Sequence, residues 1–198
     1  MAKIVSKWYI YLLSFFIAVT SFCVVTTVKT NPKETERINF VVGAVDINSY
    51  QLEAKLKENK PKGIKKISCN FLRLHSQNFN YLFTTLRSNS DFFILPYNYI
   101  VNEFKGITDY AANIDTTYVN EKLGEELDYC SFDDHYKGFK IYDSSLDEGI
   151  LKDYITYNFE DEKDDYYLFF SFKSKNIGEL NHSKSENAYE VIKEMMAL

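Results

Sequence analysis

Residues 38–47 read INFVVGAVDI, a nearly continuous apolar run that is rich in β-branched residues. Such a run is typical of a strand buried on both faces of a parallel sheet. Further along the chain, apolar residues alternate over 67–71, and residues 91–96 read DFFILP, a short apolar run closed by proline. We therefore expect three strands in the first part of this domain.

Helical spacing fills the two gaps between these strands. Leu52 and Leu56 lie four residues apart, behind the capping candidates Asn48 and Ser49. In the second gap, apolar residues recur at intervals of three and four, at Phe79, Leu82, Phe83 and Leu86. The β-α-β-α-β order predicts right-handed crossovers, and hence an α/β fold with an open, mostly parallel sheet and helices on both faces.

The remainder of the chain predicts shorter elements. Short helices are expected over 98–105 and 116–123, and a short strand over 138–142. Alternating residues over 155–159 and the aromatic run 165–172, DYYLFFSF, flank the polar segment 160–164, which predicts an antiparallel hairpin. The sheet should therefore contain one antiparallel returning strand. Ser183 with Glu186 forms a capping-box pattern ahead of a final helix.

Residues 8–28 read WYIYLLSFFIAVTSFCVVTTV and contain no charge over 21 residues. A helix of this length spans about 30 Å, the thickness of a bilayer core. Lys3 and Lys7 precede it, which favours a cytoplasmic N-terminus. The predicted organisation is a tail at 1–7, a single membrane anchor at 8–28, a linker at 29–37 and an extracellular domain at 38–198.

Two alternatives to a retained anchor stay open. A cleaved signal peptide has a shorter apolar core and a small-x-small cleavage site, whereas this run is long and ends in β-branched residues. A lipoprotein signal would place Cys23 at the mature N-terminus, although Phe22 occupies a position where such signals carry a small residue. The uniformly apolar composition argues against a buried helix of a soluble protein.

Composition and motifs predict a binding protein rather than an enzyme. The net charge of −5 argues against a nucleic-acid partner, which requires a basic face. The sequence contains no P-loop, no Gly-x-Ser-x-Gly and no His-Glu-x-x-His motif. Neither the stretch Asp133–Asp134–His135 nor the acidic run 160–165 has the spacing of a metal site, so we expect no metal and no cofactor.

Three segments carry a resemblance to a known family. They are INFVVGAVDI at 38–47, SDFFILPYNYI at 90–100, and YYLFFSFKSKNIG at 166–178 followed by the helix SENAYEVIKEMM at 185–196. Together they resemble one lobe of the extracellular solute-binding proteins of ABC transporters, particularly the sugar-binding kind. The resemblance implies a periplasmic-binding-protein-like fold, with Asp46 and Pro96 at strand ends that face a ligand cleft.

This chain departs from the family in its length. Family members have two lobes and close on the ligand between them by a hinge motion. Only 58 residues separate Pro96 from Ile155, too few for a second lobe. We therefore expect a shortened, membrane-anchored relative that acts as an accessory protein beside an ABC transporter for sugars or other small solutes, with degenerate ligand capture.

Tyrosines supply further candidate ligand-binding residues. Tyr97, Tyr99 and Tyr110 follow the third predicted strand, near the edge where ligands bind in open α/β sheets. They motivate a carbohydrate-stacking hypothesis. The alternatives are that the 16 tyrosines and 16 phenylalanines reflect overall composition, or that exposed ones form a protein interface.

Other possibilities stay open from the sequence. If the domain is exported, Cys69 and Cys130 are candidates for a disulfide. A one-lobe or dimeric small-solute sensor is the first alternative function. An exported hydrolase is the second, and it would require two carboxylates placed across a cleft.

Overall fold

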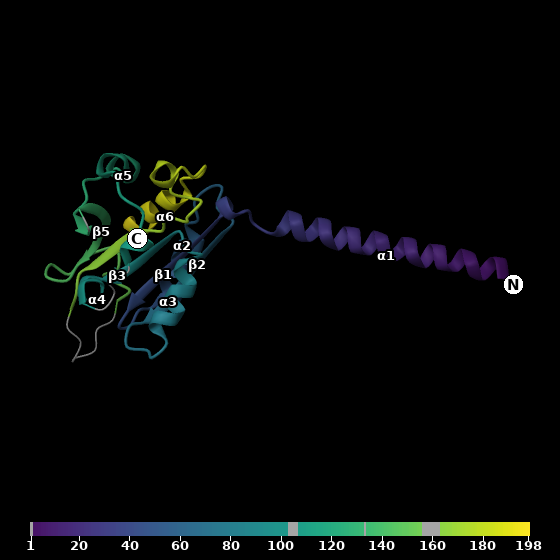
Figure 1. Cartoon of the computed structure of the whole chain (residues 1–198), viewed down its shortest axis with the longest axis horizontal. Coiled ribbons are helices and arrows are strands. Elements are labelled where there is room, and N and C mark those ends of the chain that lie inside the picture. The colour runs from purple at the N-terminus through teal and green to yellow at the C-terminus, as the bar shows by residue number, and fades with distance from the viewer. Residues whose placement is uncertain (1, 103–106, 133, 156–162) are drawn as a thin grey trace. The chain divides into compact units, whose positions relative to one another are not determined.

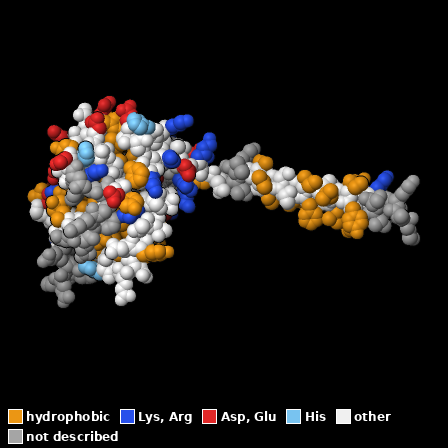
Figure 2. All heavy atoms as spheres, in the orientation of Figure 1, with side chains coloured by type: hydrophobic (Ala, Val, Ile, Leu, Met, Phe, Trp, Pro, Cys, Tyr) orange, Lys and Arg blue, Asp and Glu red, His pale blue; other side chains and the backbone are white. Residues whose placement is uncertain are grey.

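The computed structural model describes residues 2–102, 107–132, 134–155 and 163–198 (Figure 1). The chain divides into two units, Met1–Lys33 and Glu34–Leu198. The first unit contains one helix, α1 (Ala2–Thr30), within which Lys7–Thr26 has a mean hydropathy of 2.0. Hydrophobic side chains are exposed along this helix (Figure 2). An N-terminal apolar helix of this length is consistent with a signal sequence or a membrane anchor.

The second unit is built on an open seven-stranded sheet. A single 3₁₀ turn, η1 (Glu34–Glu36), leads directly into the first strand. The strand order is β2-β1-β3-β7-β5-β4, with β6 paired to β5. The strands are β1 (Arg37–Ala44), β2 (Lys66–Arg73), β3 (Phe92–Pro96), β4 (Tyr129–Phe132), β5 (His135–Asp143), β6 (Glu148–Gly149) and β7 (Tyr166–Phe170).

The sheet is mixed, so the prediction of a mostly parallel sheet is wrong. Parallel pairing joins β1 to β2 and to β3, as the β-α-β-α-β reading predicts. The pairs β3–β7, β5–β7, β4–β5 and β5–β6 are all antiparallel. The physical reason is that β4 and β5 are joined by a tight turn, which makes them antiparallel, and that β7 runs antiparallel to both β3 and β5.

The antiparallel returning strand is β7, which lies between β3 and β5. Phe92 of β3 lies in register with Phe170, and Gly138 of β5 lies in register with Phe169. These two strands occupy both edges of β7, and the predicted hairpin partner 155–159 lies outside the described residues except for Ile155. Ile155 forms a single bridge with Ile47, and residues 156–162 lie outside the described part of the chain.

Helices cover both faces of the sheet, as predicted. The helices α2 (Ser49–Glu58), α5 (Thr116–Leu123) and α6 (Asn187–Met196) pack on one face, against alternate strand residues such as Phe40 and Leu168. The opposite face carries α3 (Phe79–Arg87) and α4 (Tyr97–Asn102), packed against Val41 and Phe93. The two-residue alternation along each strand therefore builds two separate apolar cores.

Capping residues explain where several helices begin. The Asn48 side chain accepts a hydrogen bond from the Gln51 N–H and starts α2, as expected. Asp115 caps α5 in the same way, and Gly124, with a φ of 82°, ends it. The capping box predicted at Ser183 does not form, because α6 begins later, at Asn187. The Glu186 carboxylate binds Tyr118 and Lys122 of α5 instead.

Candidate functional site

The carboxyl ends of β1, β2, β3 and β5 lie at one edge of the sheet, which we call the carboxyl edge. Strands β1 and β3 are parallel, and two antiparallel steps through β7 give β5 the same direction. Asp46 follows β1, Tyr97 follows β3, and Asp143 ends β5. Ligands of open α/β sheets bind outside such strand ends, so this edge is the first candidate binding surface.

Asp46 lies at the carboxyl edge in a partly exposed ion pair. Its Oδ1 atom is 3.6 Å from the Arg73 guanidinium, which follows from the parallel register of β1 and β2. The same oxygen accepts a hydrogen bond from the Ile47 N–H. The pair therefore presents a cation and an anion side by side at the end of two adjacent strands.

Pro96 and Tyr97 mark the same edge one strand further along the sheet. Pro96 is buried at the end of β3 in register with Tyr166. Tyr97 is 42% exposed, and its ring centroid lies 5.5 Å from that of Tyr167. The Asp164 carboxylate accepts the Asn98 N–H and so fixes the start of α4. Tyr97 is the one predicted tyrosine that offers an aromatic surface at this edge.

The other two predicted tyrosines lie elsewhere. Tyr99 is buried on the α3–α4 face, where its hydroxyl donates to Asn80 Oδ1 at 2.6 Å. The Tyr110 carbonyl accepts a hydrogen bond from the Phe172 N–H, beyond the end of β7. Since β7 is antiparallel to β3, Tyr110 lies at the opposite edge of the sheet, which we call the amino edge. The Arg87 guanidinium stacks on its ring at 3.3 Å from the centroid. The structure therefore places Asp46, Pro96 and Tyr97 at one edge and leaves Tyr99 and Tyr110 out of it.

The candidate disulfide between Cys69 and Cys130 does not form. Cys69 lies on β2 and Cys130 on β4, the two outer strands of the sheet. Five strand spacings separate them, about 24 Å at 4.8 Å each, whereas bridged cysteines need Cα atoms within about 7 Å. Both thiols are free, and burial raises the pKa of each to about 12.

A charged network around Lys140 was missed by the sequence reading. The Lys140 ammonium lies 2.9 Å from Asp165, 3.2 Å from Asp143 and 3.5 Å from Asp128. Its pKa is raised chiefly by the hydrogen bond to Asp165. A lysine between the apolar residues Phe139 and Ile141 of β5 is the signal that could have indicated paired carboxylates.

The carboxylates of this network are held by local backbone and hydroxyl donors. Ser145 and Leu146 donate to Asp143, and these bonds, with Lys140, lower the Asp143 pKa. Partial burial works to raise the pKa of Asp165, but hydrogen bonds from Lys140 and Ser144 outweigh it and lower that pKa. Both acids are therefore anionic over the physiological pH range.

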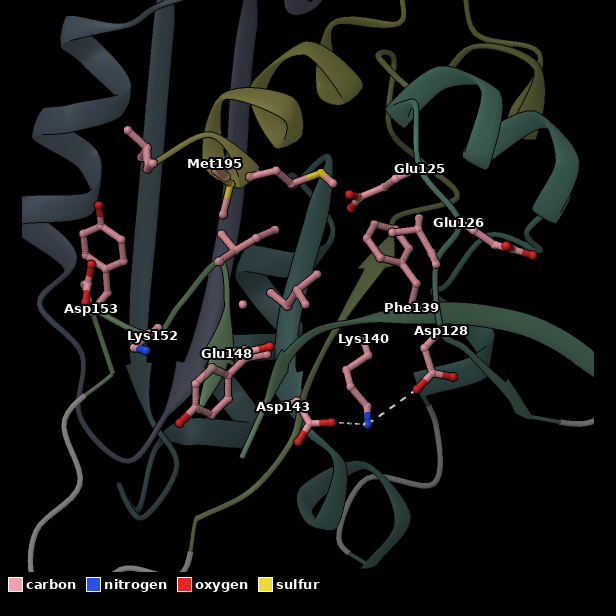
Figure 3. A pocket seen from close by; sticks show the side chains of 18 residues that line it. Glu125, Glu126, Asp128, Phe139, Lys140, Asp143, Glu148, Lys152, Asp153 and Met195 are labelled. Carbon is pink, nitrogen blue, oxygen red and sulfur yellow. Dashed lines mark hydrogen bonds and ion pairs between the residues drawn. The ribbon is translucent and has the colours of Figure 1, made fainter. Parts of the chain in front are cut away.

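A cavity of about 500 Å³ opens beside this network (Figure 3). Its walls come from the loop between α5 and β4, from β5, from the turns around β6, and from the end of α6. Residues of both apolar and acidic character line it, including Phe139, Ile141, Met195, Glu125 and Glu148. We call it the acidic cavity.

Across the described residues, no group of three His, Cys, Asp or Glu is arranged to hold a metal ion. His135 is exposed at the start of β5, and Asp134 adopts a left-handed backbone with a φ of 62°. Asp133 and residues 160–162 of the acidic run 160–165 lie outside the described part of the chain.

No protein-family model matches this chain, and it matches neither a curated protein nor a solved structure. The fold defines an α/β protein with an open mixed sheet and a single N-terminal apolar helix. The resemblance to solute-binding proteins stays a prediction.

Proposed function

We propose that this chain is a membrane-anchored extracellular binding protein, a shortened relative of the solute-binding proteins, that acts beside an ABC transporter for sugars or other small solutes. Its α/β domain would contact the transporter or another membrane protein, and it would not catalyse a reaction. The N-terminal apolar helix would hold it at the membrane.

One observation carries this proposal: an exposed carboxyl edge belongs to a chain with an apolar N-terminal helix. At this edge the domain presents the half-exposed Tyr97 ring and the Asp46–Arg73 ion pair. Aromatic and arginine side chains are enriched in protein interfaces. A tether raises the local concentration of a weakly binding module near other membrane proteins, so a small contact surface suffices.

Part of the strand order supports the family resemblance. An antiparallel β7 inserted next to β3 agrees with the returning strand that the resemblance implies. The support comes from the order β2-β1-β3-β7, and the mixed remainder of the sheet adds none.

A pull-down of the full-length protein from its own membranes in mild detergent, followed by mass spectrometry, tests this role. We expect transporter permease or ATPase subunits to be recovered with the wild type and to be lost with Tyr97→Ala. Tyr81→Ala is the matched control, since Tyr81 is also exposed, at 73%, but lies on α3. Equal recovery by both variants would assign the contact to another surface, and recovery of no membrane protein would overturn the proposal.

Topology is tested separately by protease accessibility in intact cells. An extracellular domain should be digested from outside the cell, whereas a domain protected until lysis contradicts the proposed orientation. A mature protein shortened by the length of α1 would indicate a cleaved signal in place of an anchor.

A second candidate function is the capture of a small solute by this single domain. The acidic cavity favours it, because its volume of about 500 Å³ lies within the usual range of small-ligand pockets, about 300–1,000 Å³. This candidate needs no second lobe and no transporter.

A further inference from the structure

The acidic cavity combines an apolar floor with a charged rim. The floor contains buried residues of the apolar core beneath α2, α5 and α6, namely Phe139 and Ile141 of β5 and Met195 of α6. The half-buried side chains of Leu127, Ile150 and Met196 extend this apolar lining. A ligand in the cavity would therefore place an apolar body against these side chains.

Carboxylates dominate the charge of the cavity. Six acids line it against two lysines: Glu125, Glu126, Asp128, Asp143, Glu148 and Asp153 against Lys140 and Lys152. The Lys140 ammonium is already paired with Asp128, Asp143 and Asp165 and is not available to an anionic ligand. Figure 2 shows acidic side chains gathered on the surface over α5, next to the cavity wall, so the surrounding field also favours cations.

Two of these acids come from separate walls of the cavity. Glu125 extends into it from the loop after α5, and Glu148 extends into it from β6 (Figure 3). Glu126, the neighbour of Glu125, points away from the cavity in the same view. An ammonium group placed between Glu125 and Glu148 would be attracted by both carboxylates.

We propose that the acidic cavity binds an amphipathic organic cation, whose apolar body packs on Phe139, Ile141 and Met195 and whose ammonium group lies between Glu125 and Glu148. This inference deepens the second candidate function, small-solute capture, and is independent of the transporter role. A neutral ligand would leave both carboxylates without a counter-charge, and an anion would be repelled by them.

The three methionines of the chain provide a local test. Met195 and Met196 line the cavity, whereas Met1 begins the chain and serves as a reference. The full-length protein, labelled with ¹³C at the methionine methyl groups and held in phosphatidylcholine nanodiscs, is titrated with 3-phenylpropylammonium. The matched probes are 3-phenylpropanol, which is neutral, and 3-phenylpropionate, which is anionic. Empty nanodiscs correct for partitioning of each probe into lipid.

We expect the cation to shift the Met195 and Met196 methyl signals saturably, to leave Met1 unchanged, and to bind more tightly than the other two probes. Its affinity should fall as salt concentration rises. Equal binding of the alcohol and the cation, or no shift at Met195 and Met196 with any probe, would overturn the proposal.

Variants distinguish the contribution of Glu125 and Glu148 from that of the overall negative charge of the cavity. Glu125→Gln and Glu148→Gln should each weaken cation binding by about two- to five-fold, as expected for one partly exposed ion pair. Glu126→Gln removes the same charge from a side chain that points away and should change binding much less. A loss with Glu126→Gln as large as with Glu125→Gln would overturn the assignment. Since the titration contains no transporter, failure of the pull-down does not affect it.

Discussion

Charged networks lie at both the amino edge and the carboxyl edge of the sheet, and they differ in how far their side chains are buried. At the amino edge, Asp91 precedes β3 and is only 6% exposed. At the carboxyl edge, the Lys140 network has its carboxylates on Asp128, Asp143 and Asp165 exposed by 68%, 25% and 27%. The buried Asp91 depends on hydrogen-bond donors within the protein, whereas the partly exposed carboxylates around Lys140 can also interact with an external partner.

The network at the amino edge joins distant parts of the chain. Asp91 Oδ1 accepts bonds from Ser174 Oγ at 2.6 Å and Asn176 Nδ2 at 2.8 Å, and Oδ2 accepts the Asn39 N–H. Asn176 Nδ2 also donates to the carbonyls of Glu34 and Arg37. The segment after β7 is thus fastened to the starts of β1 and β3 through one carboxylate.

The largest effect is expected from Asp91→Ala. This change leaves the donors on Ser174 and Asn39 without their acceptor in a buried place and removes one of the acceptors of Asn176. It should reduce the free energy of unfolding by about 2–5 kcal/mol. Urea unfolding of the full-length protein in detergent, followed by circular dichroism, measures it. Asp91→Asn keeps one acceptor oxygen and should lose less, whereas Asp46→Ala at the exposed edge should change little. A loss below about 1 kcal/mol for Asp91→Ala would remove the distinction between the two ends.

The pH dependence of stability should differ between Asp91 at the amino edge and Asp165 at the carboxyl edge. Burial raises the pKa of Asp91, although the bonds from Ser174, Asn176 and Asn39 oppose this shift. The folded state therefore binds a proton more tightly than the unfolded state, and stability from this group falls as pH rises from about 3.9 through the folded pKa. Asp165 has a lowered pKa, so its contribution has the opposite sign and is lost as pH falls through that pKa.

Unfolding curves between pH 3 and pH 8 separate the two contributions. The difference between the wild type and Asp91→Asn should favour the wild type most at acidic pH. The difference between the wild type and Asp165→Asn should favour the wild type most at neutral pH. The same sign for both differences would contradict the assigned pKa directions.

Lys140→Met should have a smaller effect than Asp91→Ala. Removing the ammonium leaves Asp128, Asp143 and Asp165 to repel one another, but solvent screens this repulsion, so we expect a loss of about 1–2 kcal/mol that shrinks in high salt. Lys193→Met is the control, because its bond to Glu190 on α6 is an exposed pair of residues three apart. Its loss should stay below about 0.5 kcal/mol. Equal losses for both lysines would show that the network acts as separate surface pairs.

The parallel half of the sheet could be predicted because its pattern is local. Continuous apolar runs in β1 and β3, with helical spacing between them, specify strands, crossovers and parallel pairing together. The antiparallel half could not, because β4, β5 and β7 are all aromatic-rich and their sequences do not specify which strands pair. The choice of β3 and β5 as the partners of β7 depends on long-range packing, such as that of Phe93 on Phe169, whose ring centroids lie 5.5 Å apart.

The candidate site was predictable to a similar extent. Strand ends give Asp46, Pro96 and Tyr97 their common edge once the first three strands are assigned. Tyr99 and Tyr110 follow the same strand in sequence, but the turn of α4 buries one, and the chain then carries the other to the amino edge. The acidic cavity joins four separate segments, so no local pattern could indicate it.

The smallest effect on the free energy of unfolding is expected from the addition of a reducing agent. Cys69 and Cys130 lie on the two outer strands, so no disulfide contributes to stability, and a reducing agent should change the free energy of unfolding by less than about 0.5 kcal/mol. Burial raises the pKa of both thiols to about 12, which keeps them protonated and poorly nucleophilic at neutral pH. Iodoacetamide should therefore modify both slowly in the folded protein and rapidly in urea, as mass spectrometry of the peptides would show. A reductant-dependent loss of several kcal/mol would require these two strands to be neighbours, and would overturn the strand order on which both ends of the sheet are defined.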